Sequence, residues 1–369
     1  MAADRFDMPV VYDSMGDIVI RMRGITRTFH SAAGEATVLK GIDVDVHRGE
    51  FISVVGRSGS GKSTLVNMLT RIDRPTSGTV RVGDVLIHEL PEGRMALWRG
   101  RHMGVVFQFF QLLPMLSLVE NVMLPMDFCN IYSPASREAR ALELLKRVGL
   151  EGLAHKLPGA VAGGQQQSAA VARALANDPP ILVADEPTGN LDSRTAEQVM
   201  GIFAELVEQG KTIVMVTHDQ VLARRTSRTL LISDGELVNE AVAAAFPGQS
   251  HSALLRLSKL ASPVHLLPGV DLPDTQSPAA APLYLLMGGE LLHPDHRPGY
   301  PLGPGAIVDP LAGLQVDLFA GPAGADLLSL PRAEVLPLLS PAGDSLPPLS
   351  SLPESGQAQD GLHPPGSDL

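Results

Sequence analysis

The sequence is poor in cysteine, in aromatic residues and in long apolar runs. It has one cysteine, Cys129, in 369 residues, and only 4% of the residues are aromatic. A single cysteine excludes an internal disulfide framework and is typical of a reducing compartment. No window approaches 18 uninterrupted apolar residues, so we expect no membrane-spanning helix. Residues 1–20 lack a basic stretch followed by an apolar core, so we expect no signal peptide.

Basic side chains are also scarce and form no block. The chain has 29 Lys and Arg against 40 Asp and Glu, a formal net charge of −11. Because binding to a nucleic-acid backbone requires a basic patch, we expect no DNA or RNA partner. Residues 247–369 carry −8 of this charge and 20 of the 30 prolines. The acidity therefore belongs mostly to that segment.

These composition shifts divide the chain into three parts. Residues 1–17 are an N-terminal extension, and residues 18–240 carry the helix and strand patterns of a folded domain. In residues 247–369 the periodicity fails, and the density of proline forbids long helices. We interpret this last part as a Pro/Leu/Gly-rich acidic tail that is mostly disordered, although its leucine tracts are too common for a simple solvated linker.

The most informative motif lies in the middle part. Residues 56–64 match the pattern G-x-x-x-x-G-K-[ST] and follow the apolar run 51–55. Glycines let successive backbone N–H groups point at an anion, and the following helix adds its positive end. The weaker alternative is a Gly-rich turn whose lysine binds no phosphate. We predict that the chain binds a nucleoside triphosphate through Gly56, Arg57, Ser58, Gly59, Ser60, Gly61, Lys62, Ser63 and Thr64.

Further candidate residues follow buried strands. The apolar run 181–184 ends in Asp185 and Glu186, which suits a carboxylate near Mg²⁺ and a second one that polarises water. His218 follows the apolar run 212–216, and Gln108 follows 105–107; each is a weak signal alone. Strands that alternate with helices, with chemistry at the carboxyl ends of the strands, indicate an α/β fold.

Together these motifs resemble the nucleotide-binding subunit of the ABC transporter superfamily over about residues 18–238. The strings 105–114, 120–122 and 186–192 are similar to the LolD, MacB and FtsE group, whose subunits pair with FtsX-like permeases. The resemblance implies an α/β fold: a P-loop NTPase ABC cassette with a RecA-like core, an antiparallel β subdomain and a helical insert at about 110–165. It also implies ATP and Mg²⁺ as cofactors.

The resemblance assigns roles to single residues. Phe29 matches the aromatic residue that stacks on adenine. Asp185, with Ser63 and Gln108, matches the Mg²⁺ ligands, whereas Glu186 matches the general base. His218 matches the switch histidine, which with Glu186 and Gln108 completes the catalytic set. Residues 189–192 resemble the loop that crosses to a second subunit.

One motif departs from the family pattern. Where the family has Leu-Ser-Gly-Gly-Gln, which contacts the ATP of the opposite subunit, this chain has Ala162, Gly163, Gly164 and Gln165 after Val161. Ala162 removes one hydrogen bond to a charged oxygen, commonly about 1.5–3 kcal/mol. Ser168 replaces the arginine that usually follows. We expect nucleotide binding to the phosphate loop to survive. Dimer closure and hydrolysis are either weakened, or preserved at a lower rate because neighbouring residues compensate for the lost hydrogen bond.

Two functions fit these observations. In the first, the chain is an ATP-hydrolysing motor subunit that forms a homodimer or heterodimer. It would drive a separate FtsX/MacB/LolCE-type permease from the cytoplasmic face of the inner membrane, held there by that partner. In the second, it is a catalytically weak regulatory subunit with a degenerate signature. A soluble ABC protein of translation or DNA repair fits less well, because the chain has one cassette and no heptad run.

Overall fold

The computed structural model describes residues 17–32, 34–273, 281–294, 301–309 and 318–339. The expected N-terminal extension falls almost wholly outside these residues. The described residues up to 243 form one compact unit together with residues 250–255. The described residues of 244–249 and those from 256 onward form a second compact unit.

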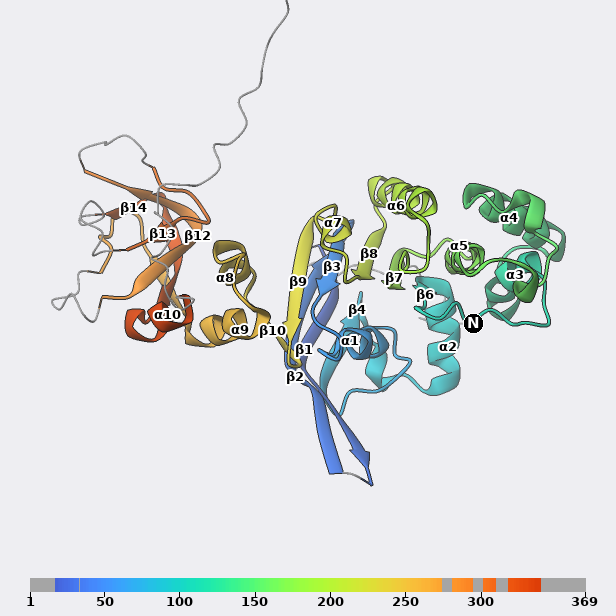
Figure 1. Ribbon diagram of the computed structural model, residues 1–369, viewed down its shortest axis with the longest axis horizontal. Helices are drawn as coiled ribbons and strands as arrows, with labels where there is room; N and C mark the ends of the chain where they lie inside the picture. The colour runs from blue at the N-terminus through green and yellow to red at the C-terminus, as the bar shows by residue number, and fades with distance from the viewer. Residues whose placement is uncertain (1–16, 33, 274–280, 295–300, 310–317, 340–369) are drawn as a thin grey trace, which may run out of the picture. The chain divides into compact units, whose positions relative to one another are not determined.

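The first unit is built on a six-stranded sheet in the order β10-β9-β3-β8-β7-β6 (Figure 1). Neighbouring strands are parallel except for β10, which runs antiparallel to β9. The strands are β3 (Phe51–Val55), β6 (Met103–Val106), β7 (Ile181–Asp185), β8 (Thr212–Val216), β9 (Arg228–Ser233) and β10 (Glu236–Leu237). Three helices connect or follow these strands: α1 (Lys62–Leu69), α6 (Ser193–Glu208) and α7 (Gln220–Ala223).

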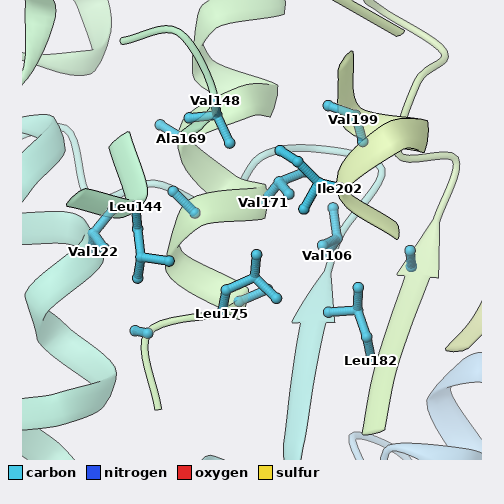
Figure 2. Packing of buried hydrophobic residues seen from close by; sticks show 14 of the residues in the cluster. Val106, Val122, Leu144, Val148, Ala169, Val171, Leu175, Leu182, Val199 and Ile202 are labelled. Carbon is cyan, nitrogen blue, oxygen red and sulfur yellow. The ribbon is translucent and has the colours of Figure 1, made fainter. Parts of the chain in front are cut away.

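The apolar runs predicted as buried strands are buried on both faces. Alternate residues of β7 and β8 belong to two separate hydrophobic clusters, since Leu182 and Ile213 pack in one while Val183 and Val214 pack in the other. Figure 2 shows Leu182 and Val106 beside the helical side chains of the first cluster. A strand covered on both faces has no polar side, which explains its uninterrupted apolar sequence.

A second sheet in this unit is antiparallel, with the order β2-β1-β4-β5. Its strands are β1 (Ile18–Ser31), β2 (Gly34–His47), β4 (Ser77–Val82) and β5 (Val85–Leu86). Strands β1 and β2 are long and pair with several register irregularities. The predicted antiparallel β subdomain is confirmed.

Three of the remaining helices of this unit form a helical subdomain. Helices α3 (Leu118–Cys129), α4 (Pro134–Arg147) and α5 (Gly163–Ala174) share one hydrophobic cluster, with short 3₁₀ turns at Glu151–Leu153 and Pro158–Ala160. Helix α2 (Glu92–His102) and the 3₁₀ turn Ile87–Glu89 adjoin them but bury Ile87, Met95 and Trp98 in the cluster that includes the antiparallel sheet. A capping box at Ser117 and Glu120 starts α3. On α2, the buried Trp98 stacks on His102 with ring centroids 4.8 Å apart.

The expectation of a mostly disordered tail is corrected for the described residues. They contain a four-stranded antiparallel sheet in the order β11-β14-β12-β13, with its own hydrophobic cluster. Its strands are β11 (Ser262–Leu266), β12 (Leu283–Leu292), β13 (Ile307–Val308) and β14 (Phe319–Leu330). Helices α8 (Glu240–Ala245), α9 (His251–Leu260) and α10 (Arg332–Leu339) complete the described chain. The part of the tail beyond residue 339 lies outside the described residues.

Two physical features explain why this sheet was not predicted from the sequence. Its prolines avoid the paired positions of the inner strands: β12 contains none, and Pro322 of β14 falls between the two paired stretches of that strand. At Gly289 the chain has φ +74°, and a Cβ there would lie 2.2 Å from the Gly324 carbonyl oxygen. Only glycine allows two backbones to approach so closely. Glycine and proline thus interrupt the apolar alternation by which a strand is recognised in a sequence, although the sheet itself forms.

We expect Leu286→Ala to destabilise the second sheet. Leu286 on β12 is fully buried, and truncation of a buried leucine costs about 2–5 kcal/mol. Peptide-resolved hydrogen exchange should show lost protection over residues 262–330. The control is Met287→Ala, because the neighbouring Met287 is 40% exposed. Equal protection in both variants would contradict a packed core around Leu286.

Candidate functional site

The predicted phosphate loop connects the carboxyl end of β3 to the start of α1. Gly61 has φ +107° and caps α1, and a Cβ there would lie 2.9 Å from the Leu39 side chain. A Cβ at Gly56 would lie 2.3 Å from the Ile232 carbonyl oxygen. Both positions therefore require glycine because the backbone passes too close to its neighbours.

The side chains of the loop are held in place by its own backbone. The Lys62 ammonium donates to the carbonyl oxygens of Gly56 at 2.9 Å and Arg57 at 3.0 Å. These two bonds fold the lysine back onto the loop. The Ser60 hydroxyl is buried without a hydrogen-bond partner among the described residues. The loop thus offers an anion the Lys62 cation at the start of a helix.

The loop forms one wall of a cavity of about 480 Å³. Other walls come from residues that follow β6, β7 and β8, as expected for the carboxyl edge of a parallel sheet. The cavity is lined by Val38, Gly56, Ser58, Gly59, Gly61, Lys62, Ser63, Thr64, Gln108, Asp185, Glu186 and His218. Eleven of these twelve were candidates from the sequence, which the fold brings together from four chain segments.

Val38 is the exception, and sequence reasoning missed it. It lies on β2, beside the close approach of Gly61 and Gly235 to the backbone of that strand. Its side chain carries no chemistry, and the pattern of the strand gives no signal that one apolar residue faces a cavity. Only the packing of the antiparallel sheet against the loop places it there.

Asp185 lies at the buried end of β7. Burial raises the pKa of its carboxyl, and a hydrogen bond from the Ser63 hydroxyl opposes that rise. The Oδ1 atom is buried and has no hydrogen-bond partner among the described residues. An unpartnered carboxylate oxygen next to a hydroxyl fits a divalent cation that takes oxygen ligands. No group of three or more His, Cys, Asp or Glu residues able to hold a metal exists in the described chain. A cation here would thus need phosphate or water oxygens as well.

Glu186 is fixed in an uncommon backbone conformation. Its φ of +50° lies in the left-handed region, and its N–H donates to the Val216 carbonyl oxygen at 3.0 Å. One carboxylate oxygen lies 2.8 Å from His218 Nδ1. The carboxylate is largely buried, whereas the His218 side chain is exposed. Such strain persists where the surroundings over-determine it and often marks a functional residue.

The structure places other candidates outside this cavity. Phe29 is on β1, partly exposed, with the Arg27 guanidinium 4.4 Å from its ring centroid. Arg57 and Ser60 belong to the loop but do not line the cavity. The signature residues 162–165 lie at the start of α5 and do not line it either. A cavity within one chain therefore uses the loop and the strand ends but not the signature.

The two unusual signature residues have clear local surroundings. Ala162 is the N-cap of α5, and its N–H donates to the Gln165 Oε1 at 3.0 Å. Its methyl group cannot accept a bond from the helix, so the N–H groups of the first turn lack a side-chain cap. Ser168 is buried, and its hydroxyl donates to the Gly164 carbonyl oxygen at 3.2 Å. The serine hydroxyl is thus satisfied within the helix.

Asp192 starts α6 after the loop 189–192. Its carboxylate accepts hydrogen bonds from the N–H groups of Arg194 and Thr195 and from the Thr195 hydroxyl at 2.7 Å. These bonds, led by that hydroxyl, hold the pKa of Asp192 below its ordinary value. The ionised carboxylate therefore anchors the end of this loop to the helix.

The chain is similar to known ATP-binding proteins. The chain is 40% identical over 220 residues to the lipoprotein-releasing system ATP-binding protein LolD of Bacteroides thetaiotaomicron, which covers 59% of this chain and 99% of that relative. The chain belongs to the ABC transporter family, as an ATP-binding subunit. The sequence profile of that family, described as ABC transporter, matches residues 39–189.

Two further relatives show how far the similarity extends. The macrolide export ATP-binding/permease protein MacB 1/2 of Paracoccus denitrificans is 44% identical over 223 residues, which are 60% of this chain but 33% of that larger protein. The dimeric ATP-binding cassette MJ0796 of Methanocaldococcus jannaschii, solved bound to ADP and Pi, is 41% identical with a TM-score of 0.58. It covers 60% of this chain and 97% of its own. The predicted ABC cassette fold is confirmed.

We expect Asp192→Ala to lower stability in a pH-dependent way. The pKa of Asp192 is lower in the folded than in the unfolded state, so its ionisation stabilises the fold above the unfolded value of about 3.9. That contribution is lost as pH falls through the folded pKa. Urea unfolding of wild type and variant should differ at pH 7 and converge below pH 4. Thr195→Val should show a smaller loss with the same pH dependence. A difference that is constant from pH 3 to 7 would refute this origin.

Proposed function

We propose that the chain is an ATP-hydrolysing motor subunit. The observation that carries the proposal is the convergence of the phosphate loop, Asp185 and the Glu186–His218 pair in one cavity. Lys62 and the loop N–H groups would hold the β- and γ-phosphates. Glu186, oriented by its backbone and by His218, would accept the proton of the attacking water.

Magnesium is the metal that this arrangement favours. Ser63, Asp185 and Gln108 would hold it together with phosphate and water oxygens, in keeping with the few protein ligands that Mg²⁺ takes in nucleotide sites. When bound, the ion would neutralise charge that develops on the phosphates. Gln108 follows β6 and begins the segment that leads to the helical subdomain. A change at Gln108 on metal binding would therefore reach that subdomain.

A second copy or a related subunit would complete the site. The N–H groups of Gly163 and Gly164 lie at a helix start, where the dipole favours anions, yet they do not line their own cavity. We propose that they contact the γ-phosphate held by the opposite subunit, in a homodimer or heterodimer. Phe29 would stack on the adenine through one face of its ring, whereas the Arg27 guanidinium lies over the other face.

We propose a separate FtsX/MacB/LolCE-type permease as the partner. An apolar groove of about 600 Å³ is lined by α2, α3 and the segment after β6, and Arg173 and Asn177 also line it. Leu97 is 47% and Phe128 is 74% exposed on its rim, which is unusual for large apolar residues and marks a contact surface. No helix in the described chain is long and apolar enough to cross a membrane. The permease would therefore recruit the chain to the cytoplasmic face of the inner membrane.

A second function stays open because of Ala162. Without a hydroxyl at the helix start, the signature has one donor fewer for the opposite nucleotide. The chain would then bind ATP but hydrolyse it weakly and act as a regulatory subunit, for instance beside a partner with an intact signature.

Steady-state ATP hydrolysis with Mg²⁺ distinguishes these two functions. We expect wild-type turnover, with Glu186→Gln at least about 100-fold slower because the general base is lost. Ala162→Ser should raise turnover about tenfold or more if the missing hydroxyl limits closure. Turnover that appears only in Ala162→Ser would favour the regulatory subunit. Turnover equal in wild type and Glu186→Gln would refute the motor.

The permease proposal is tested by sedimentation with membranes. We expect the wild-type protein to bind membrane vesicles prepared from the cells in which it naturally occurs. It should not bind protein-free liposomes made from the same lipids. Phe128→Asp should abolish binding because it charges the groove rim. Val221→Asp is the control, since Val221 is 71% exposed and outside the groove. Equal binding by both variants would reject the groove, and binding to liposomes would reject a protein partner.

A further inference from the structure

Arg173 on α5 is linked both to the apolar groove and to the segment that enters the nucleotide cavity. Arg173 lines the apolar groove, and its two terminal nitrogens donate to backbone carbonyl oxygens of the segment after Gln108. Nη2 donates to Phe110 at 2.8 Å, and Nη1 donates to Gln111. Gln108 itself lines the nucleotide cavity. One side chain thus touches the groove and holds the segment that enters the cavity.

This arginine has no ion pair within the described residues. Burial is the cause that lowers the pKa of its guanidinium below the ordinary value. The side chain is half-buried, and among the described residues its charge is met by the two carbonyl oxygens rather than by a carboxylate. Bonds from a charged donor are about twice as strong as neutral ones, so the segment 110–111 is held firmly.

The same helix contacts this segment on both sides of Gln108. The buried Gln167 amide donates to the Phe107 carbonyl oxygen at 3.5 Å, a long bond. The Phe110 ring lies 3.7 Å from where a Cβ of Gly163 would be, in ordinary contact with the signature. Gln111 has φ +54°, so the chain turns sharply just where Arg173 grips it. Helix α5 therefore carries the signature at one end and the support of Gln108 along its side.

We propose that Arg173 is a positioning residue that ties Gln108 to the signature helix. Through these bonds the position of α5 sets that of Gln108 relative to the cation site in the nucleotide cavity. The inference rests on the proposed function, because it assumes that Gln108 acts on the Mg²⁺ of bound ATP.

The test compares Arg173→Met with Arg140→Met. Arg140 on α4 is a matched control, since it also donates to backbone carbonyls, those of Ala176 at 2.7 Å and Leu175 at 3.4 Å, but away from Gln108. The readout is the affinity for a fluorescent ATP analogue with Mg²⁺ and with EDTA. We expect Arg173→Met to reduce the gain from Mg²⁺ about fivefold or more, with affinity in EDTA unchanged. Arg140→Met should leave both affinities unchanged.

A double-mutant cycle separates positioning from general damage. If Arg173 acts through Gln108, adding Arg173→Met to Gln108→Ala should cause no further loss, whereas independent effects would add. Arg173→Lys, which keeps the charge and can reach one carbonyl, should recover part of the gain from Mg²⁺. Thermal unfolding of every variant identifies those that fail to fold, and Arg173→Lys then carries the test.

Several outcomes would overturn the inference. These are additive losses in the cycle, equal effects of Arg173→Met and Arg140→Met, or a loss of affinity in EDTA as large as that in Mg²⁺. Failure of the motor proposal is seen elsewhere, in wild-type hydrolysis no faster than that of Glu186→Gln. Because the binding readout needs no turnover, the two failures are distinguishable.

Discussion

The parallel pairing of β3, β7 and β8 is the constraint on which the site depends. In this register Asp185 lies opposite Val216, and β3 pairs with β8 up to Val54 and Val216. The loop, the carboxylates and the histidine that follow these strands must therefore emerge at one edge of the sheet. The apolar clusters on both faces secure this pairing, so the chemistry is positioned by residues that never touch it.

The sequence predicted what is local. The phosphate loop, Asp185, Glu186, Gln108 and His218 each follow an apolar run, and the α/β order implies that strand ends meet. Val38 could not be found, because its position depends on the antiparallel sheet closing over the loop. The C-terminal sheet was missed since β11 and β14 pair residues about 60 positions apart, and average proline density ignores where the prolines fall.

The signature illustrates a different limit. The residues at the start of α5 matched a family pattern by order alone, but a single chain does not bring them to its own nucleotide cavity. Their role stays a proposal that depends on a second subunit. The structure adds that Ser168 is locally satisfied, whereas Ala162 leaves a helix start without a side-chain acceptor. The two departures from the family pattern thus differ in kind: one is absorbed by packing, and the other alters the surface that a partner would meet.

The buried stack of Trp98 on His102 has an optical consequence. Trp98 is the only tryptophan in the chain, and it lies on α2, the helix that also contributes Leu97 to the groove. Near-ultraviolet emission selected for indole therefore comes from this one helix and from no other part of the protein. A shielded indole emits at shorter wavelength than a hydrated one. The native protein consequently carries its own fluorophore on a helix that lines the groove, without labels or added residues.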